Sequence, residues 1–152
     1  MVVPPPHEPD LVQLLTRAER LLSRRMLPIL AAEDTTAEAW RVISLLADGA
    51  GHPMTDLSEH AFLPPATLTK LVDRLVDDNL VYRRVDDVDR RRIRAYLTPR
   101  GRRLHQRVRQ RIDADLALVP LSDADRGLLE HLLAGLTGSL DAAAAGSITP
   151  RR

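Results

Sequence analysis

Residues 80–98 carry the side chains of clearest chemical meaning in this 152-residue sequence. Two β-prone runs, 80–85 and 93–98, flank a tip made almost wholly of aspartate and arginine, which predicts a hairpin. A guanidinium on such a tip suits a narrow minor groove of DNA, where the negative potential is concentrated. Asp89 stands two residues before Arg91, a spacing at which the acid can hold the arginine in place. The alternative interpretation is a mobile charged turn.

A helix predicted over 66–78 precedes this hairpin, and a shorter helix precedes that one. A short helix, a longer helix and an arginine-tipped hairpin make a winged helix-turn-helix, whose second helix lies in the major groove with its N-terminal residues at the base edges. The alternative interpretation is that the residues of this helix do not bind DNA and form an ordinary solvent-exposed face. The candidate DNA-binding residues are Pro65, Ala66, Thr67, Thr69, Lys70, Asp73 and Arg74 on the helix, and Arg83, Arg84, Asp89, Arg90, Arg91 and Arg92 on the hairpin.

The distribution of charge supports a nucleic-acid partner, although the net charge is only +1. Residues 80–111 hold 12 arginines against 3 acidic residues, a net +9, whereas residues 112–145 hold one arginine and six acidic residues, a net −5. Such segregation is typical of a nucleic-acid face on an acidic body. The alternative is a winged helix that binds another protein, and the +9 segment argues against it. DNA binding that weakens steeply as salt rises would exclude this alternative.

Catalysis and membrane insertion find no support in the sequence. There is no cysteine, which excludes disulfides, thiolate zinc sites and cysteine nucleophiles. No His-Glu-x-x-His pattern, nucleophile elbow or phosphate loop occurs, so we predict neither an enzyme nor a cofactor. A zinc-responsive variant stays open, because His52, His60, His105 or His131 could converge with carboxylates. No apolar run reaches the ~18 residues of a membrane span and no secretory signal is visible, so we expect a cytoplasmic protein.

Helical periodicity begins at Asp10, after an N-terminal stretch, 1–9, that we interpret as a flexible arm. Pro28 is expected to kink or end the first helix. Thr35 and Glu38 form a capping box for the next helix. Thr55 can cap the short helix that follows.

Beyond the hairpin, Pro99 opens a further helix, and residues 122–125 cap the last one. The last helix has a broad apolar stripe of leucines, more than a single small core needs. Residues 146–152 are interpreted as a flexible tail. The fold class is therefore mainly α with a small β-wing: six helices and an antiparallel hairpin of two or three strands.

Four runs of this sequence resemble the MarR family of bacterial transcription regulators: WRVISLL at 40–46, LTKLVDRLVDDNLVYRR at 68–84, DRR at 89–91 and LTPRG at 97–101. The resemblance covers roughly residues 10–142, and the Asp-x-Arg wing followed by Leu-Thr-x-x-Gly is its most specific part. It implies a homodimer whose N- and C-terminal helices intertwine, and a pseudo-palindromic DNA operator. It also implies release by a small ligand, commonly aromatic or phenolic. The family's wing-tip arginine and its supporting aspartate fall on Arg91 and Asp89.

The resemblance divides residues 10–145 into dimerisation helices at 10–34 and 99–145 and a DNA-binding lobe at 35–98. A ligand pocket between them would use Arg17, Trp40 and Arg41, although Trp40 also fits a plain core position. The chain departs from the family at Pro64–Pro65, where the family usually has a polar cap before the recognition helix. It departs again at Asn79, which replaces a frequent glycine but tolerates the same backbone.

Overall fold

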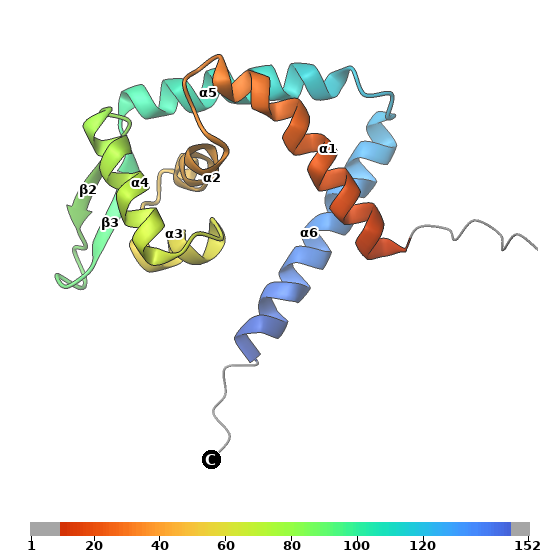
Figure 1. Ribbon diagram of the computed structural model, residues 1–152. Helices are drawn as coiled ribbons and strands as arrows, with labels where there is room; N and C mark the ends of the chain where they lie inside the picture. Colours follow the sequence, from red (N-terminus) through yellow and green to blue (C-terminus); the bar gives the residue numbers. More distant parts are fainter. Residues whose placement is uncertain (1–9, 147–152) are drawn as a thin grey trace, which may run out of the picture. The chain divides into compact units, whose positions relative to one another are not determined.

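The computed structural model describes residues 10–146 and divides after Leu116 into two compact units, which are described separately here. The predicted arm at 1–9 and the tail from 147 lie outside the described residues. Figure 1 shows the six helices and the small sheet, which confirm the predicted fold class. In chain order the elements are α1 (Leu11–Ala31), α2 (Ala37–Leu45), the 3-10 helix η1 (Leu46–Asp48), β1 (His52–Pro53), α3 (Met54–His60), α4 (Pro65–Asp77), β2 (Val81–Val85), β3 (Ile93–Leu97), α5 (Pro99–Ala117) and α6 (Asp123–Gly146).

The core of the first unit joins one apolar face of each of its helices to the inner side of the sheet. In α4 the buried residues are Leu68, Val72 and Leu75, which lie three or four positions apart as a helical stripe requires. Leu57 of α3 and Val108 of α5 pack into the same cluster. This burial fixes which side of α4 faces outward.

The sheet is antiparallel with the strand order β1–β3–β2. Tyr82 lies opposite Tyr96, and their rings stack with centroids 5.3 Å apart. The left-handed backbone predicted for Asn79 is confirmed, with φ of 56°. Thr98 then closes the base of the hairpin, because its hydroxyl donates to the Asn79 carbonyl (2.7 Å) and accepts the Gly101 N–H (3.0 Å) at the start of α5.

Two local predictions were wrong, those for Thr35 and Thr55, and one of the two effects expected of Pro28, a kink or an end of the helix, is excluded. Thr36, not Thr35, caps α2 and accepts the Ala39 N–H at 3.1 Å, because adjacent threonines cannot be told apart by composition. Thr55 lies inside α3, whose cap position is Pro53 with no side-chain bond. Pro28 does not end α1, which continues to Ala31.

The turn between α3 and α4 holds a bulky residue in a backbone conformation that favours glycine. Phe62 has φ of 53°, and its side chain is exposed. The turn around it is closed by the Leu63 N–H on the Ser58 carbonyl (3.0 Å) and by the Ser58 hydroxyl on the Leu63 carbonyl (2.6 Å). These bonds fix the start of α4 relative to α3.

Two helices expose rows of large apolar side chains. On α1 these are Leu11, Val12, Leu14, Leu21, Leu22 and Leu27, and on α6 they are Leu128, Leu129, Leu132, Leu133 and Leu140. Monomeric proteins rarely leave so much apolar surface in water. None of the helices in the described part of the chain has the length and apolarity needed to cross a membrane.

Candidate nucleic-acid interface

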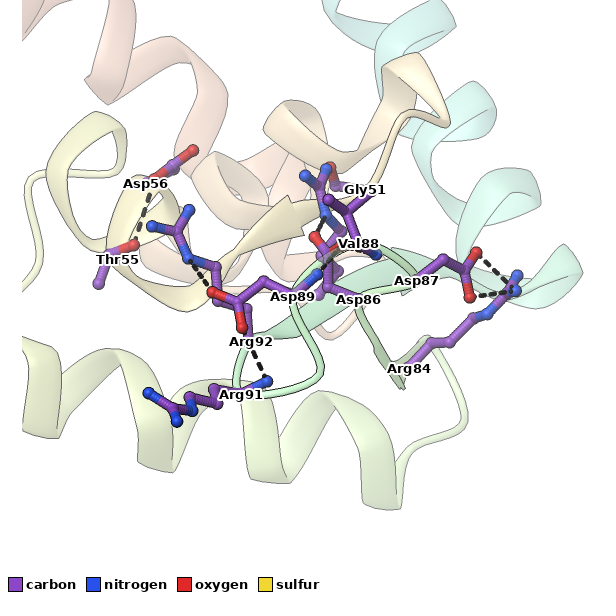
Figure 2. A network of polar contacts seen from close by, with 11 residues as sticks. Gly51, Thr55, Asp56, Arg84, Asp86, Asp87, Val88, Asp89, Arg91 and Arg92 are labelled. Carbon is purple, nitrogen blue, oxygen red and sulfur yellow. Dashed lines mark hydrogen bonds and ion pairs between the residues drawn. The ribbon is translucent and has the colours of Figure 1, made fainter.

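The tip of the hairpin is organised by Asp86, a residue that the sequence analysis did not single out. Figure 2 shows its carboxylate at the centre of a network of polar contacts. One oxygen accepts the backbone N–H groups of Val88 (2.8 Å) and Asp89 (3.1 Å). The other oxygen pairs with Arg94 of β3, which also donates to the Gly51 carbonyl at 3.1 Å. The tip is therefore tied to the turn before β1.

This network keeps Asp86 ionised. The residue is 7% exposed, and the hydrogen bond from Arg94, followed by those from the Val88 and Asp89 amides, lowers the pKa of Asp86 from 3.8 to about 2. The Gly51 carbonyl is the acceptor for Arg94, and this position requires glycine for two reasons. A Cβ there would lie 2.2 Å from the Tyr96 ring, and the backbone φ is +71°, which favours glycine. The structure indicates a rigid tip, which differs from a mobile charged turn.

Asp89 does not pair with the guanidinium of Arg91. Its carboxylate accepts the backbone N–H of Arg91 (3.1 Å) and forms an ion pair with Arg92 (3.4 Å). The predicted contact to the Arg91 side chain is therefore wrong, since a two-residue spacing in this turn brings the acid to the backbone instead. Within the described residues, the Arg91 guanidinium has no hydrogen-bond or ion-pair partner and extends freely from the tip (Figure 2).

Two other candidate arginines are held by acids of the lobe itself. Arg83 of β2 binds Asp73 of α4 at 2.6 Å, which links the strand to the outer face of that helix. Arg84 binds Asp87 with both contacts near 3 Å, at 2.9 and 3.0 Å. These pairs reduce the positive field of the two arginines.

The N-terminal half of α4 presents the predicted residues to solvent. Pro65, Ala66, Thr67 and Lys70 are exposed, and Thr69 is exposed with its hydroxyl donating to the Pro65 carbonyl at 2.9 Å. The helix has no side-chain cap, because Pro64 occupies that position. In Figure 1 this end of α4 and the hairpin tip both lie away from α5. The structure thus brings the two predicted groups to one side of the unit.

Four of the six α5 arginines bind groups of the scaffold, so the +9 counted along residues 80–111 is not all available to DNA. Arg107 and Arg111 share the carboxylate of Glu33, at 3.1 and 3.4 Å. Arg109 pairs with Asp113, and Arg102 donates to the Leu97 carbonyl. These side chains stabilise the helical scaffold, because charge counted along the chain takes no account of direction.

A separate apolar hollow of about 250 Å³ lies between α1 and α2, and Trp40 and Arg41 are among its lining residues. Arg41 also forms an ion pair with Glu38 at 3.8 Å. Trp40 is largely buried in the core, and its ring stacks on His105 with centroids 5.1 Å apart. Burial, and then the Arg109 cation, lower the pKa of His105, which favours its neutral form. Arg17 lines a different hollow, formed by α1 residues.

The histidines named as alternative metal ligands have separate surroundings. His52 pairs with Asp48 at 2.8 Å, and His60 contacts the Asp56 carbonyl at 2.8 Å. Among the side chains that the structure describes, no three histidines or carboxylates gather in a way that could hold a metal ion. The zinc-responsive alternative gains no support from this arrangement.

Comparisons with known proteins agree with this geometry. Residues 33–92 match the family model described as MarR family. The chain is 32% identical over 130 residues to the HTH-type transcriptional regulator FarR of Neisseria gonorrhoeae, covering 84% of this chain and 89% of that protein. It is 28% identical to the homoprotocatechuate degradative operon repressor of Escherichia coli, covering 70% and 72%. The crystal structure of NadR in complex with 4-hydroxyphenylacetate is similar with a TM-score of 0.76 and 29% identity, covering 90% and 97%.

Proposed function

Because this chain belongs to the MarR family of transcription regulators, we propose that it binds a pseudo-palindromic DNA operator as a homodimer and represses transcription there. The observation that carries this proposal is the joint exposure of the α4 N-terminus and the unpaired Arg91 guanidinium on one side of the lobe. The helix would enter the major groove, and the tip would enter the adjacent minor groove. We place the protein in the cytoplasm with its DNA and assign it no catalytic role.

The exposed apolar rows support the homodimer. The leucines of α1 and α6 would be covered by the same helices of a second copy, as a twofold interface requires. A dimer would present two recognition helices about one DNA turn apart, roughly 34 Å. Sedimentation of the purified protein tests this proposal, because a monomer at micromolar concentration would contradict it.

The test of DNA binding is a salt series on the DNA upstream of the protein's own coding sequence, with unrelated DNA as competitor. Competitor-resistant binding by two protomers, with affinity that falls steeply as salt rises, is expected. Equal affinity for the upstream DNA and the unrelated DNA would mean that the operator lies elsewhere. No binding even at low salt would favour a protein-interaction module.

Replacement of Arg91 by alanine is expected to weaken operator binding by about 1–3 kcal/mol. The reason is that no other contact within the described protein uses this guanidinium, so its whole interaction would be with DNA. Asp89→Ala should also weaken binding, because it frees the Arg91 backbone N–H that holds the tip in shape, and this loss should outweigh the release of the Arg92 cation. Titration of labelled operator measures both variants.

Asp87→Ala is the matched control, because it removes the same charge without touching the tip backbone. It should leave binding unchanged or tighten it. Tighter binding by Asp89→Ala would contradict the positioning role and show that the charge dominates.

We also propose that a small phenolic acid enters the hollow beside Trp40 and weakens DNA binding. A volume of about 250 Å³ is smaller than the range for drug-sized ligands and suits a single aromatic ring. The Trp40 ring supplies an apolar wall, and Arg41 supplies a cation for the carboxylate. The name of NadR's bound ligand, 4-hydroxyphenylacetate, identifies a first compound to test. Ligand binding would change the spacing of the two DNA-binding lobes in the dimer.

Trp40 is the only tryptophan in the sequence, so its fluorescence reports on this hollow directly. Titration with 4-hydroxyphenylacetate is expected to change the fluorescence saturably and to lower operator affinity over the same concentration range. Arg41→Ala should weaken the response, and Arg17→Ala should not, because Arg17 lines another hollow. Binding without a change in Trp40 fluorescence would place the ligand elsewhere.

A further inference from the structure

Val88 stands at the tip of the hairpin with 96% of its surface exposed, more than any other large apolar side chain in the described part of the chain. Its position is fixed nevertheless. The Val88 N–H donates to the buried Asp86 carboxylate at 2.8 Å, and Asp86 is anchored to Arg94 and, through it, to the Gly51 carbonyl. The backbone that carries Val88 is therefore anchored, and its aliphatic side chain projects into water.

Four charged neighbours of Val88 form two ion pairs with each other. Arg84 pairs with Asp87, and Asp89 pairs with Arg92 (Figure 2). Val88, Arg90 and Arg91 remain as side chains without such contacts in the described residues. Just behind the tip, the cross-strand pair of Val85 and Ile93 is exposed by 52% and 48% and adds aliphatic surface. The tip thus combines a free cation with an apolar projection.

These two properties match the minor groove of DNA. A cation is attracted to the narrow groove of A·T sequences, and proteins that bind the minor groove frequently place apolar side chains in it. An A·T pair offers only acceptors there, whereas a G·C pair adds the guanine 2-amino donor. An aliphatic group pressed on that donor would remove it from water and give it no acceptor, which is costly.

We propose that Val88 enters the minor groove beside Arg91 and selects A·T over G·C pairs, because its methyl groups cover the guanine 2-amino group without accepting its hydrogen bond. This proposal rests on the operator-binding function proposed above and adds a determinant of specificity besides the contacts of α4. Arg91 supplies attraction to the groove, and Val88 supplies discrimination between base pairs.

The experiment uses the full-length protein and a duplex that it selects from a random-sequence library. Footprinting locates the minor-groove positions that the hairpin protects. There, A·T pairs are replaced one at a time by G·C and by inosine·C, which resembles G·C but lacks the 2-amino group. The wild type should bind the G·C duplex about tenfold more weakly and the inosine·C duplex nearly as well as the original.

Val88→Thr is the decisive variant, because it is almost the same size and its hydroxyl can accept a bond from the 2-amino group. The ratio of affinities for inosine·C and G·C should fall from about ten to below about two. Arg91→Ala is the contrast, since it should weaken binding to all duplexes and keep the ratio. Circular dichroism confirms that the variants remain folded.

The outcomes separate the two proposals. An equal ratio in wild type and Val88→Thr, or equal binding of inosine·C and G·C by the wild type, overturns the role of Val88 and leaves operator binding intact. Failure to select any duplex overturns operator binding itself, and the role of Val88 with it.

Discussion

Replacement of Asp86 by asparagine is expected to lower operator affinity on the order of tenfold, although the residue is buried in the unit. An asparagine keeps one acceptor oxygen for the backbone N–H groups. Its NH₂ group then faces Arg94, so the arginine meets a donor in place of a negatively charged acceptor. The two N–H bonds at Val88 and Asp89 and the pair with Arg94 cannot all survive this change. The tip would then have to be ordered when DNA binds, which costs conformational entropy.

The pH dependence of stability provides an independent readout of Asp86. Its pKa in the folded protein is about 2, below the ordinary value of 3.8, so its contribution to stability is present above pH 4 and is lost as the pH falls toward 2. The difference in unfolding free energy between wild type and Asp86→Asn should therefore shrink across that interval. Urea unfolding at fixed protein concentration measures it. A difference that stays constant with pH would mean that the charge of Asp86 is unimportant.

The second large effect is expected for Gly101→Ala, which should destabilise the protein by about 3 kcal/mol. A Cβ at this position would lie 2.1 Å from the Leu80 carbonyl oxygen, which is backbone and cannot move aside cheaply. The same glycine donates its N–H to Thr98, whose hydroxyl also bonds the Asn79 carbonyl. The close approach therefore joins the start of α5 to the base of the hairpin.

Chemical unfolding followed by circular dichroism measures this loss. Gly127→Ala is the matched control, because nothing lies within 4 Å of a Cβ there and the residue is also helical. It should leave stability unchanged or raise it by about 0.5–1 kcal/mol, since alanine favours a helix over glycine. Equal effects of the two substitutions would show that helix propensity, and not the contact with Leu80, determines the result.

Sequence patterns alone determined the elements of this fold. The apolar stripe of α4, the two strands of the hairpin, the left-handed Asn79 and the proline at the start of α5 all follow from local periodicity or turn chemistry. Such features depend on residues within one or two turns of each other, so they are visible in one dimension. They also led to the candidate DNA-binding residues, which the structure shows to be exposed and whose role stays a prediction.

The tertiary structure decided how the charges are used. Asp86 is important because folding brings the Arg94 guanidinium to its carboxylate. The same guanidinium reaches the Gly51 carbonyl, which is 43 residues away from Arg94 in the sequence. The same folding turns several α5 arginines toward acids of the scaffold instead of toward the interface. An ion pair depends on the path of the whole backbone and on the direction of each side chain. A count of charges along the sequence includes neither the path of the backbone nor the direction of the side chains. For that reason it overestimated the basic face and missed the role of Asp86.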